Sequence, residues 1–299
     1  MKVLITGFNG QLGQALIKAN QTEKLDIISL SRNEMNFLNP ESIKRNIKLY
    51  KPDWIINAAA YTEVDKAESE PEIATAVNYY GTKTIAEELK CSGGKLLQIS
   101  TDFVFSGDQG KPYETSSKRN PIGIYGKSKA KAEEIIEKIL LPSSQGKILR
   151  TSWVMGPVRK NFALTMLKLH QSRSEIRVVC DQIGCPTSTH DLSMACWQLI
   201  KKDEKNIPIP DILHWSDAGA ASWYDVAVAV GEIGEQIGLI RRSAKIKPIM
   251  TSEYVTAAKR PHFSLLNCSK TESIIDIERS HWRANLRKIL INYSNINKN

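Results

Sequence analysis

A tyrosine and a lysine four residues apart are the first candidates for chemistry in this sequence. Tyr125 and Lys129 lie in the stretch "NPIGIYGKSKAKAE" (120–133), which begins like a loop and continues like a helix. Positions i and i+4 share one face of a helix, so the two polar ends would lie together. A phenol titrates at about pH 10, and a neighbouring ammonium lowers that pKa toward a useful range. The pair therefore predicts a proton-transfer site.

The spacing alone does not identify the site. With nine Tyr in the chain, about one such pair is expected by chance, and a second one exists at Tyr79 and Lys83. Thr101 supplies the missing context, because it ends an apolar run and strand ends face the ligand crevice of a doubly wound sheet. Its hydroxyl can hydrogen-bond a substrate carbonyl oxygen. Tyr125 is therefore the predicted proton carrier, and the Tyr79 pair is assigned to surface and packing.

The elements that would position these side chains alternate along the first half of the chain. Short apolar runs predict five strands, at 2–6, 26–31, 54–59, 95–101 and 146–153. Amphipathic stretches between them predict helices, among them 11–20, 40–50 and 76–90. Continuous apolar strands that alternate with helices indicate an α/β fold with a doubly wound parallel sheet, Rossmann-like and suited to NAD(P).

The second half of the chain has a looser rhythm, with helices predicted at 161–170 and 222–238. We therefore expect an NADP-binding domain at 1–155. Residues 156–299 are expected to form a smaller, mixed α/β and mostly substrate-binding domain. Parts of 176–205 and 245–265 are candidates to return to the first domain.

Composition and charge limit the class of protein. The 299 residues are 41% hydrophobic and 24% charged, which is ordinary for a globular protein. No apolar run reaches the roughly 18 residues of a membrane span, so we expect no membrane partner and a cytoplasmic location. The net charge of +9 is not gathered into basic runs, which argues against nucleic acid and suits a small anionic substrate. The five Cys match no metal signature and are expected to be reduced.

Three glycines follow the first predicted strand, in "TGFNGQLGQAL". Gly7, Gly10 and Gly13 lie at the start of the first predicted helix. A turn without Cβ atoms lets the backbone approach a pyrophosphate, and a helix N-terminus offers free N–H groups to it. Gly13 would also let the helix lie close to the strand. This spacing predicts a dinucleotide site.

The end of the second predicted strand bears on the choice of dinucleotide. NAD sites usually carry an acidic residue there for the ribose 2′-hydroxyl, whereas this chain has Ser31 and Arg32. A hydroxyl and a guanidinium suit a 2′-phosphate. We therefore predict NADPH as the preferred cofactor, with NADH as the alternative; an ordinary surface position for Arg32 is the competing interpretation.

Taken together, the glycine turn, "NAAA" (57–60), the strand-end Thr and the Tyr–Lys pair resemble the extended short-chain dehydrogenase/reductases. The finer text resembles the reductases of dTDP-4-dehydrorhamnose within that superfamily. Stretches that carry this likeness follow one another in order over residues 1–267, including "NAAAYTEVDKAESEPEIATAVN", "STDFVFSG", "DQIGCPTST" and "RPHFSLLN".

The resemblance implies NADPH-dependent reduction of the C4 ketone of dTDP-4-dehydro-L-rhamnose, the last step of dTDP-L-rhamnose synthesis for cell-surface polysaccharide. A reductase of another 4-keto-deoxysugar nucleotide and a non-catalytic, NADP-binding regulatory subunit are the alternatives. Tyr125 would donate the proton, Lys129 would hold the cofactor ribose, and Thr101 would lie beside them. The further cofactor contacts implied are Gln11, Leu12, Asn36, Phe37, Ala60, Tyr61 and Thr62. The substrate contacts implied are Thr101, Asp102, Trp153 and Arg260, the last near the diphosphate.

Three positions depart from the family pattern. Phe103 stands where Tyr is common and Phe263 where Asn is usual, which leaves the exact sugar nucleotide open. Ala15 stands where some members carry an acidic residue linked to a metal at a dimer interface. Mg²⁺ is therefore doubtful, no metal ligand is assigned, and the chain is expected to be a monomer or a homodimer.

Overall fold

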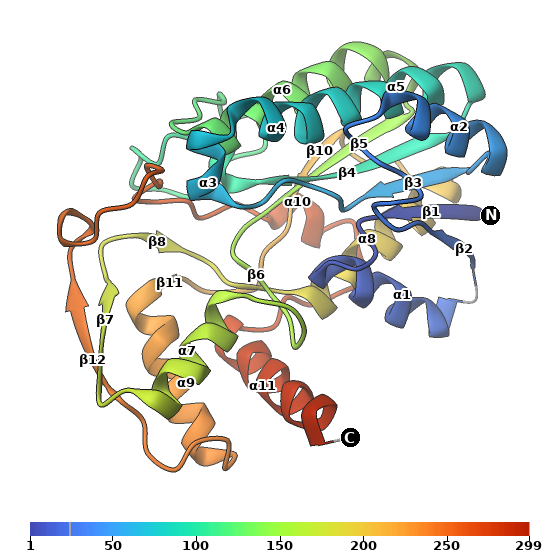
Figure 1. Ribbon diagram of the computed structural model, residues 1–299. Helices are drawn as coiled ribbons and strands as arrows, with labels where there is room; N and C mark the ends of the chain where they lie inside the picture. The colour runs from blue at the N-terminus through green and yellow to red at the C-terminus, as the bar shows by residue number, and fades with distance from the viewer. Residues whose placement is uncertain (24, 299) are drawn as a thin grey trace.

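The computed structural model describes residues 1–23 and 25–298, and a parallel sheet occupies its upper half as drawn in Figure 1. The sheet has six strands in the order β10-β5-β4-β3-β1-β2, and each neighbouring pair is parallel. The prediction of a doubly wound parallel sheet is confirmed. The strands are β1 (Lys2–Thr6), β2 (Asp26–Ser29), β3 (Trp54–Asn57), β4 (Lys95–Thr101), β5 (Gly146–Thr151) and β10 (Ile212–His214).

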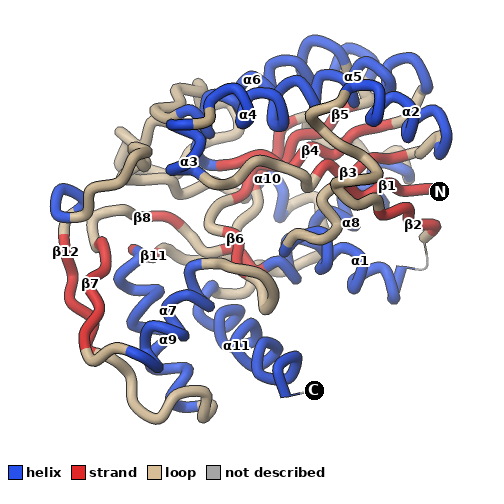
Figure 2. Tube along the Cα trace, in the orientation of Figure 1, coloured by secondary structure: helices blue, strands red, loops and turns tan. Residues whose placement is uncertain are grey.

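Helices cover both faces of this sheet, as Figure 2 shows. Alternate residues of β1 explain why, because Val3 and Ile5 belong to one apolar core and Leu4 to another. The first core also contains residues of α1 (Gln11–Glu23) and α8 (Thr189–Glu204). The second contains residues of α2 (Pro40–Tyr50), α5 (Gly81–Ser92) and α6 (Ile124–Ile139). Strands buried on both sides must be apolar throughout, which is the pattern that the sequence shows.

Shorter helices connect these layers. Between β3 and α5 lie α3 (Val64–Ser69), α4 (Pro71–Thr75) and the π-helix η1 (Ala76–Tyr80). The helix predicted at 76–90 is present, but its first five residues form a π-helix. The remaining short helices are η2 (Asp102–Val104), η3 (Leu141–Ser143), η4 (Thr251–Glu253) and α10 (Ser269–Glu272).

A second group of elements lies below the sheet in Figure 1. Its helices α7 (Phe162–Ser172), α9 (Trp223–Gln236) and α11 (Trp282–Lys298) share a separate apolar core. Parallel strands β7 (Glu175–Val179) and β12 (Lys245–Ile249) pair beside them. Two further short pairs are β6 (Val154–Met155) with β9 (Thr187–Ser188), and β8 (Ile183–Gly184) with β11 (Ala221–Ser222).

The two groups of elements do not divide strictly by chain order. Helix α8 packs on α1 at the main sheet, whereas residues 245–249 pair with β7. The edge strand β10 comes from the second half of the chain and had no sequence signal of its own. The domain boundary near residue 155 stays a prediction.

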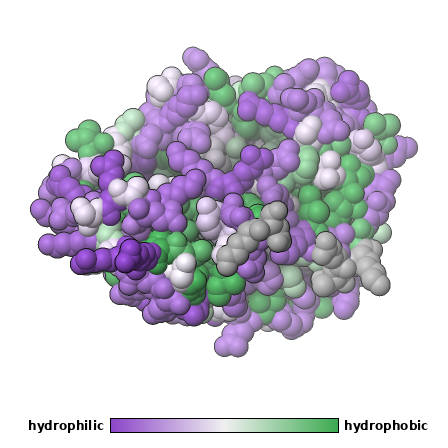
Figure 3. All heavy atoms as spheres, turned by 60° about the horizontal axis from the view of Figure 1, so that its bottom comes forward, coloured by the Kyte–Doolittle hydropathy of each residue, from purple (hydrophilic) through white to green (hydrophobic). Residues whose placement is uncertain are grey.

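The face of the molecule drawn in Figure 3 is mostly hydrophilic, with hydrophobic side chains gathered in smaller patches. Within residues 1–23 and 25–298, every helix falls short of the length and apolar character needed to cross a bilayer.

The strand order also locates the place where a ligand can bind. β2 and β3 lie on opposite sides of β1, so the winding of the chain reverses between β1 and β3. In open α/β sheets, ligands bind beyond the carboxyl ends of the strands at such a reversal. A ligand is therefore expected to contact the side chains that follow β1, β3, β4 and β5.

Candidate active site

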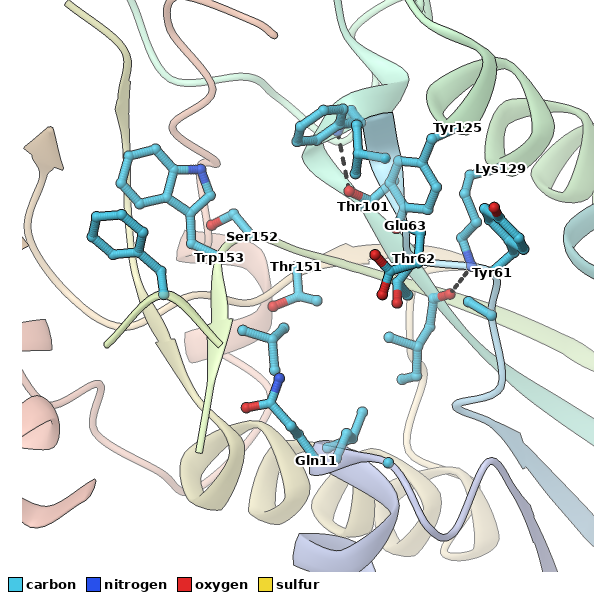
Figure 4. Close-up of a pocket in the computed structure, with 18 of the residues that line it drawn as sticks. Gln11, Tyr61, Thr62, Glu63, Thr101, Tyr125, Lys129, Thr151, Ser152 and Trp153 are labelled. Carbon is cyan, nitrogen blue, oxygen red and sulfur yellow. Dashed lines mark hydrogen bonds between the residues drawn. The ribbon is translucent and has the colours of Figure 1, made fainter. Parts of the chain in front are cut away.

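A cleft of about 1130 Å³ opens at this edge of the sheet (Figure 4). All but one of the residues predicted for cofactor or substrate line it. They are Gly7, Gly10, Gln11, Leu12, Gly13, Arg32, Asn36, Phe37, Ala60, Tyr61, Thr62, Thr101, Asp102, Tyr125, Lys129, Trp153 and Arg260.

The glycine turn after β1 is as tight as its sequence suggests. Gly7 has φ +66°, and a Cβ there would lie 2.8 Å from the backbone of Ala59. A Cβ on Gly13 would lie 2.4 Å from the carbonyl oxygen of Gly7 and from Cα of Phe8. The turn thus leaves no room for side chains, and α1 begins immediately after it. A bare turn at a helix N-terminus fits the pyrophosphate of a dinucleotide.

Ser31 is the predicted residue that lies outside the cleft lining. Its hydroxyl accepts from the backbone N–H of Glu34 at 3.3 Å, and its own N–H donates to a Glu34 carboxylate oxygen at 2.7 Å. Arg32 lines the cleft and is exposed. Of the two residues predicted to bind a 2′-phosphate, only Arg32 therefore lines the cleft.

Gln11 contacts the far wall of the cleft rather than presenting a free amide. Its Oε1 accepts from the backbone N–H of Gly156 at 2.9 Å and from Nδ2 of Asn161 at 2.8 Å. Asn161 is the N-cap residue of α7. The first turn of α1 is therefore joined by one side chain to the helix that carries Phe162 and Met166 into the cleft.

Asn78 is a site residue that the sequence gave no reason to select. It is buried in the π-helix, where its Oδ1 accepts from the N–H of Tyr61 at 2.8 Å. Its Nδ2 donates to the carbonyl of Tyr61 at 3.1 Å and to Oγ of Ser128 at 2.9 Å. One amide thus fixes the loop after β3 against α6. The phenol of Tyr61 itself donates to Glu70 at 2.7 Å.

Tyr125 and Lys129 extend side by side from α6 into the cleft (Figure 4). Nζ of Lys129 donates to the carbonyl of Ile99 on β4 at 2.7 Å. Thr101, at the end of β4, donates from Oγ1 to Asp102 at 3.0 Å. The hydroxyl, the phenol and the ammonium predicted from the sequence thus line the same cleft.

The alternative pair lies elsewhere. Neither Tyr79 nor Lys83 belongs to the cleft lining that the described residues form. Nζ of Lys83 lies 3.7 Å from a carboxylate oxygen of Glu87 on the helix surface.

The charge states of the catalytic candidates follow from burial. Burial raises the pKa of Tyr125 to about 12, although a hydrogen bond with Thr101 opposes this effect. Burial lowers the pKa of Lys129 to about 8. The prediction that Lys129 lowers the pKa of the phenol is therefore wrong for this structure, because its ammonium binds a carbonyl of β4 instead. The phenol keeps its proton at neutral pH, which is the state required of a proton donor.

Asp102 is a buried carboxyl group beside these residues. It is 1% exposed, and its Oδ2 has no hydrogen-bond partner among the residues that the structure describes. Burial raises the pKa of this group to about 6. A buried oxygen without a partner is costly, and here it belongs to a residue that lines the cleft.

Aromatic side chains form the wall opposite α6. Trp153 has φ +46°, a conformation that is strained for a bulky residue and often found at functional sites. Its ring stacks on Trp223 with centroids 3.5 Å apart and planes 8° apart. Phe162 packs against Trp223 at 4.7 Å. The wall is therefore a preformed apolar surface suited to a sugar or base.

Three other residues selected from the sequence have specific partners. Arg260 is already ion-paired, with Nη2 2.5 Å from Asp65 of α3. Phe103 packs edge-on against the Tyr125 ring at 5.6 Å. Phe263 forms a backbone bridge with Ile183 and lies outside the cleft lining drawn from the described chain.

Known proteins resemble this chain over nearly its whole length. The family described as RmlD substrate binding domain matches residues 1–295. The spore coat polysaccharide biosynthesis protein SpsK of Bacillus subtilis is 38% identical over 97% of this chain and 96% of its own length. A dTDP-4-dehydrorhamnose reductase of Sinorhizobium fredii is 36% identical over 97% of both chains. The crystal structure of dTDP-4-dehydrorhamnose reductase from Bacillus anthracis in complex with NADP is 32% identical, with a TM-score of 0.87 over 97% of this chain and 99% of that one.

Proposed function

The chain belongs to the dTDP-4-dehydrorhamnose reductase family, and from this membership we propose that it reduces the C4 ketone of dTDP-4-dehydro-L-rhamnose with NADPH. The product is dTDP-L-rhamnose, a precursor of cell-surface polysaccharide, and we place the reaction in the cytoplasm. The observation that carries the proposal is that Thr101, Tyr125 and Lys129 line the same cleft as a bare glycine turn.

The residues present suit the cofactor. The turn at Gly7 and Gly13 leaves backbone N–H groups accessible to a pyrophosphate, and Arg32 offers a guanidinium for a 2′-phosphate. The loop of Ala60, Tyr61 and Thr62, held by Asn78, would lie along the cofactor, and Lys129 would bind its ribose. NADPH, when bound, supplies a hydride for the ketone carbon.

The protein residues then handle the proton and the geometry. Tyr125 donates its phenolic proton to the substrate oxygen, because burial keeps the phenol protonated until that oxygen becomes more basic than the phenolate. Thr101 orients the carbonyl through its hydroxyl. The ammonium of Lys129 would hold the cofactor ribose through charge-assisted hydrogen bonds. Trp153 and Asp102 would contact the sugar nucleotide, since both residues line the cleft.

The test is a cofactor-oxidation assay with dTDP-4-dehydro-L-rhamnose and each nicotinamide. We expect Tyr125→Phe to lower kcat by at least about 100-fold, since positioned acid catalysis contributes that much, while the Kd for NADPH stays within about twofold because the ring remains. Tyr79→Phe is the matched control and should retain wild-type turnover. A Tyr125→Phe enzyme of full activity would refute the assignment.

The same assay separates the alternatives. Faster turnover of another 4-keto-deoxysugar nucleotide would identify a different substrate. Phe103, which departs from the family pattern and packs against Tyr125, keeps this alternative open. NADPH binding without oxidation of any sugar nucleotide would indicate a regulatory subunit. We propose a monomer or homodimer, to be checked by light scattering.

A further inference from the structure

Glu133 is a fully buried carboxylate on the helix that carries the catalytic candidates. Its side chain is 0% exposed. It lies one turn beyond Lys129, which itself lies one turn beyond Tyr125, so the three residues share one face of α6. The reaction proposed above gives Glu133 no part, and a buried carboxylate is costly unless it is paired and hydrogen-bonded.

Both oxygens of Glu133 are occupied by donors from other segments. One accepts from Oγ of Ser100 on β4 at 2.5 Å and from Nε of Arg150 on β5 at 2.9 Å. The other accepts from Nη2 of Arg150 at 2.6 Å and from Nη1 of Arg119 at 3.1 Å. A single side chain thus ties α6 to two neighbouring strands and to the loop before the helix.

The two strand residues stand next to the cleft. Ser100 and Arg150 are paired in the β4–β5 register, and the following pair is Thr101 with Thr151. Thr101 and Thr151 both line the cleft. The Glu133 carboxylate is therefore bonded to both strands directly beside Thr101 and Thr151, and Lys129 adds a second bond from α6 to β4.

The charges around Glu133 keep it ionised. Burial raises its pKa, but Arg150, Ser100 and Arg119 together hold it below the ordinary range of a carboxyl group. Arg119 also binds Glu137 at 2.7 and 2.8 Å. The neighbouring imidazole of His214 lies 3.3 Å from Nη1 of Arg150, and burial lowers its pKa to about 3. The imidazole is therefore neutral and does not compete for the carboxylate.

The carboxylate also acts on Lys129. Burial lowers the pKa of this ammonium, and the charge of Glu133 opposes that effect. The ammonium of Lys129 donates a hydrogen bond to the carbonyl of Ile99, and the neighbouring phenol of Tyr125 is uncharged at neutral pH. The charge of Glu133 is therefore the main electrostatic support of the ammonium within the protein.

We propose that Glu133 is a positioning residue of the reductase: it fixes the Tyr125–Lys129 face of α6 against Thr101 and keeps Lys129 positively charged. This inference rests on the reductase function proposed above. The cluster of Ser100, Glu133, Arg150 and Arg119 would thus affect catalysis indirectly, through the positions of Tyr125 and Lys129.

The test compares Glu133→Gln with a control, Glu137→Gln. The control also removes a carboxylate of α6 that binds Arg119, but one helical turn further from Lys129. The measured quantity is kcat of the NADPH-dependent reaction as a function of pH. Activity is lost as the pH rises through the pKa of Lys129, so removal of the Glu133 charge should move this alkaline limb downward by about one pH unit. Glu137→Gln should leave the limb in place.

Glu133→Asp provides the second readout, since it keeps the charge but shortens its reach to Ser100 and Arg150. We expect its alkaline limb to stay at the wild-type pH while kcat falls at least about tenfold, as small misplacements of catalytic groups can cost. If Glu133→Gln does not fold, the Asp variant decides alone. Wild-type kcat in Glu133→Asp, or an unmoved limb in a folded Glu133→Gln enzyme, would overturn the inference. A wild-type protein without turnover would instead refute the reductase function.

Discussion

Replacement of Gly13 by Ala tests whether the turn after β1 is shaped for a pyrophosphate. The new Cβ would lie 2.4 Å from both the Gly7 carbonyl oxygen and Cα of Phe8, whereas ordinary contact begins at 3.4 Å. Both obstacles are backbone atoms that no rotamer change can move. The start of α1 must therefore withdraw from the turn by about 1 Å, because overpacked sites shift their backbone.

This shift has a calculable effect on cofactor affinity. A hydrogen bond near 2.9 Å that lengthens by about 1 Å is effectively lost. Hydrogen bonds to charged groups contribute roughly 1.5–3 kcal/mol each. The loss of one bond from the α1 N-terminus to a phosphate thus costs about 2 kcal/mol, or roughly a 30-fold higher Kd for NADPH.

The assay is calorimetric titration of the purified protein with NADPH, with two graded controls. Gly10→Ala places its Cβ 3.1 Å from the Gly7 carbonyl oxygen and should weaken binding less. Gly110→Ala meets no described atom within 4 Å and should bind like the wild type. Wild-type affinity in Gly13→Ala, with a folded protein confirmed by its melting curve, would refute the turn as the pyrophosphate site.

Two further predictions concern the charged residues of the cleft. Arg32→Ala should lower kcat/KM with NADPH by at least about tenfold, because one charge-assisted hydrogen bond to the 2′-phosphate is lost. The kcat/KM with NADH should change little. Equal losses with both cofactors would contradict the assignment of Arg32 to the 2′-phosphate. Asp102→Asn should stabilise the fold at alkaline pH, because burial raises the folded-state pKa of Asp102 to about 6, above the ordinary aspartate pKa of 3.8. The wild type therefore gains stability as the pH falls through 6, and the advantage of the variant, about 3 kcal/mol at pH 8, should shrink by about half at pH 5. Thermal unfolding at the two pH values measures it, and an advantage that does not vary with pH would exclude Asp102 as the titrating group.

Much of the main sheet could be predicted because its signals are local. The runs at 2–6 and 95–101 became strands with those bounds, since strands buried on both faces must be apolar at every position. The glycine spacing indicated the turn after β1 for a similar reason, as a Cβ on Gly13 would collide with Gly7 and Phe8 only a few residues earlier. Strand β10 could not be predicted, because a three-residue edge strand carries too short a pattern.

The site was predictable where one residue carries the chemistry and not where several segments meet. Tyr125, Lys129 and Thr101 have recognisable types and spacing. Asn78 lies in a π-helix that no sequence periodicity indicates. Arg150 is one of several polar residues in its strand, and nothing in the sequence distinguishes it from the others. Glu133 did have a signal, since it continues the four-residue step from Lys129. The pKa of Tyr125 was misjudged because burial and the direction of the Lys129 side chain depend on the tertiary structure.

The amide of Gln11 connects the two ends of the cleft. It belongs to the first residue of α1, yet it accepts hydrogen bonds from Gly156 and from Asn161, the cap of α7, and the next residue, Phe162, lines the cleft. A dinucleotide bound at the glycine turn would therefore also order the start of α7 before the sugar nucleotide binds. We therefore expect compulsory-order kinetics, in which the nicotinamide enters first and the oxidised nucleotide departs last.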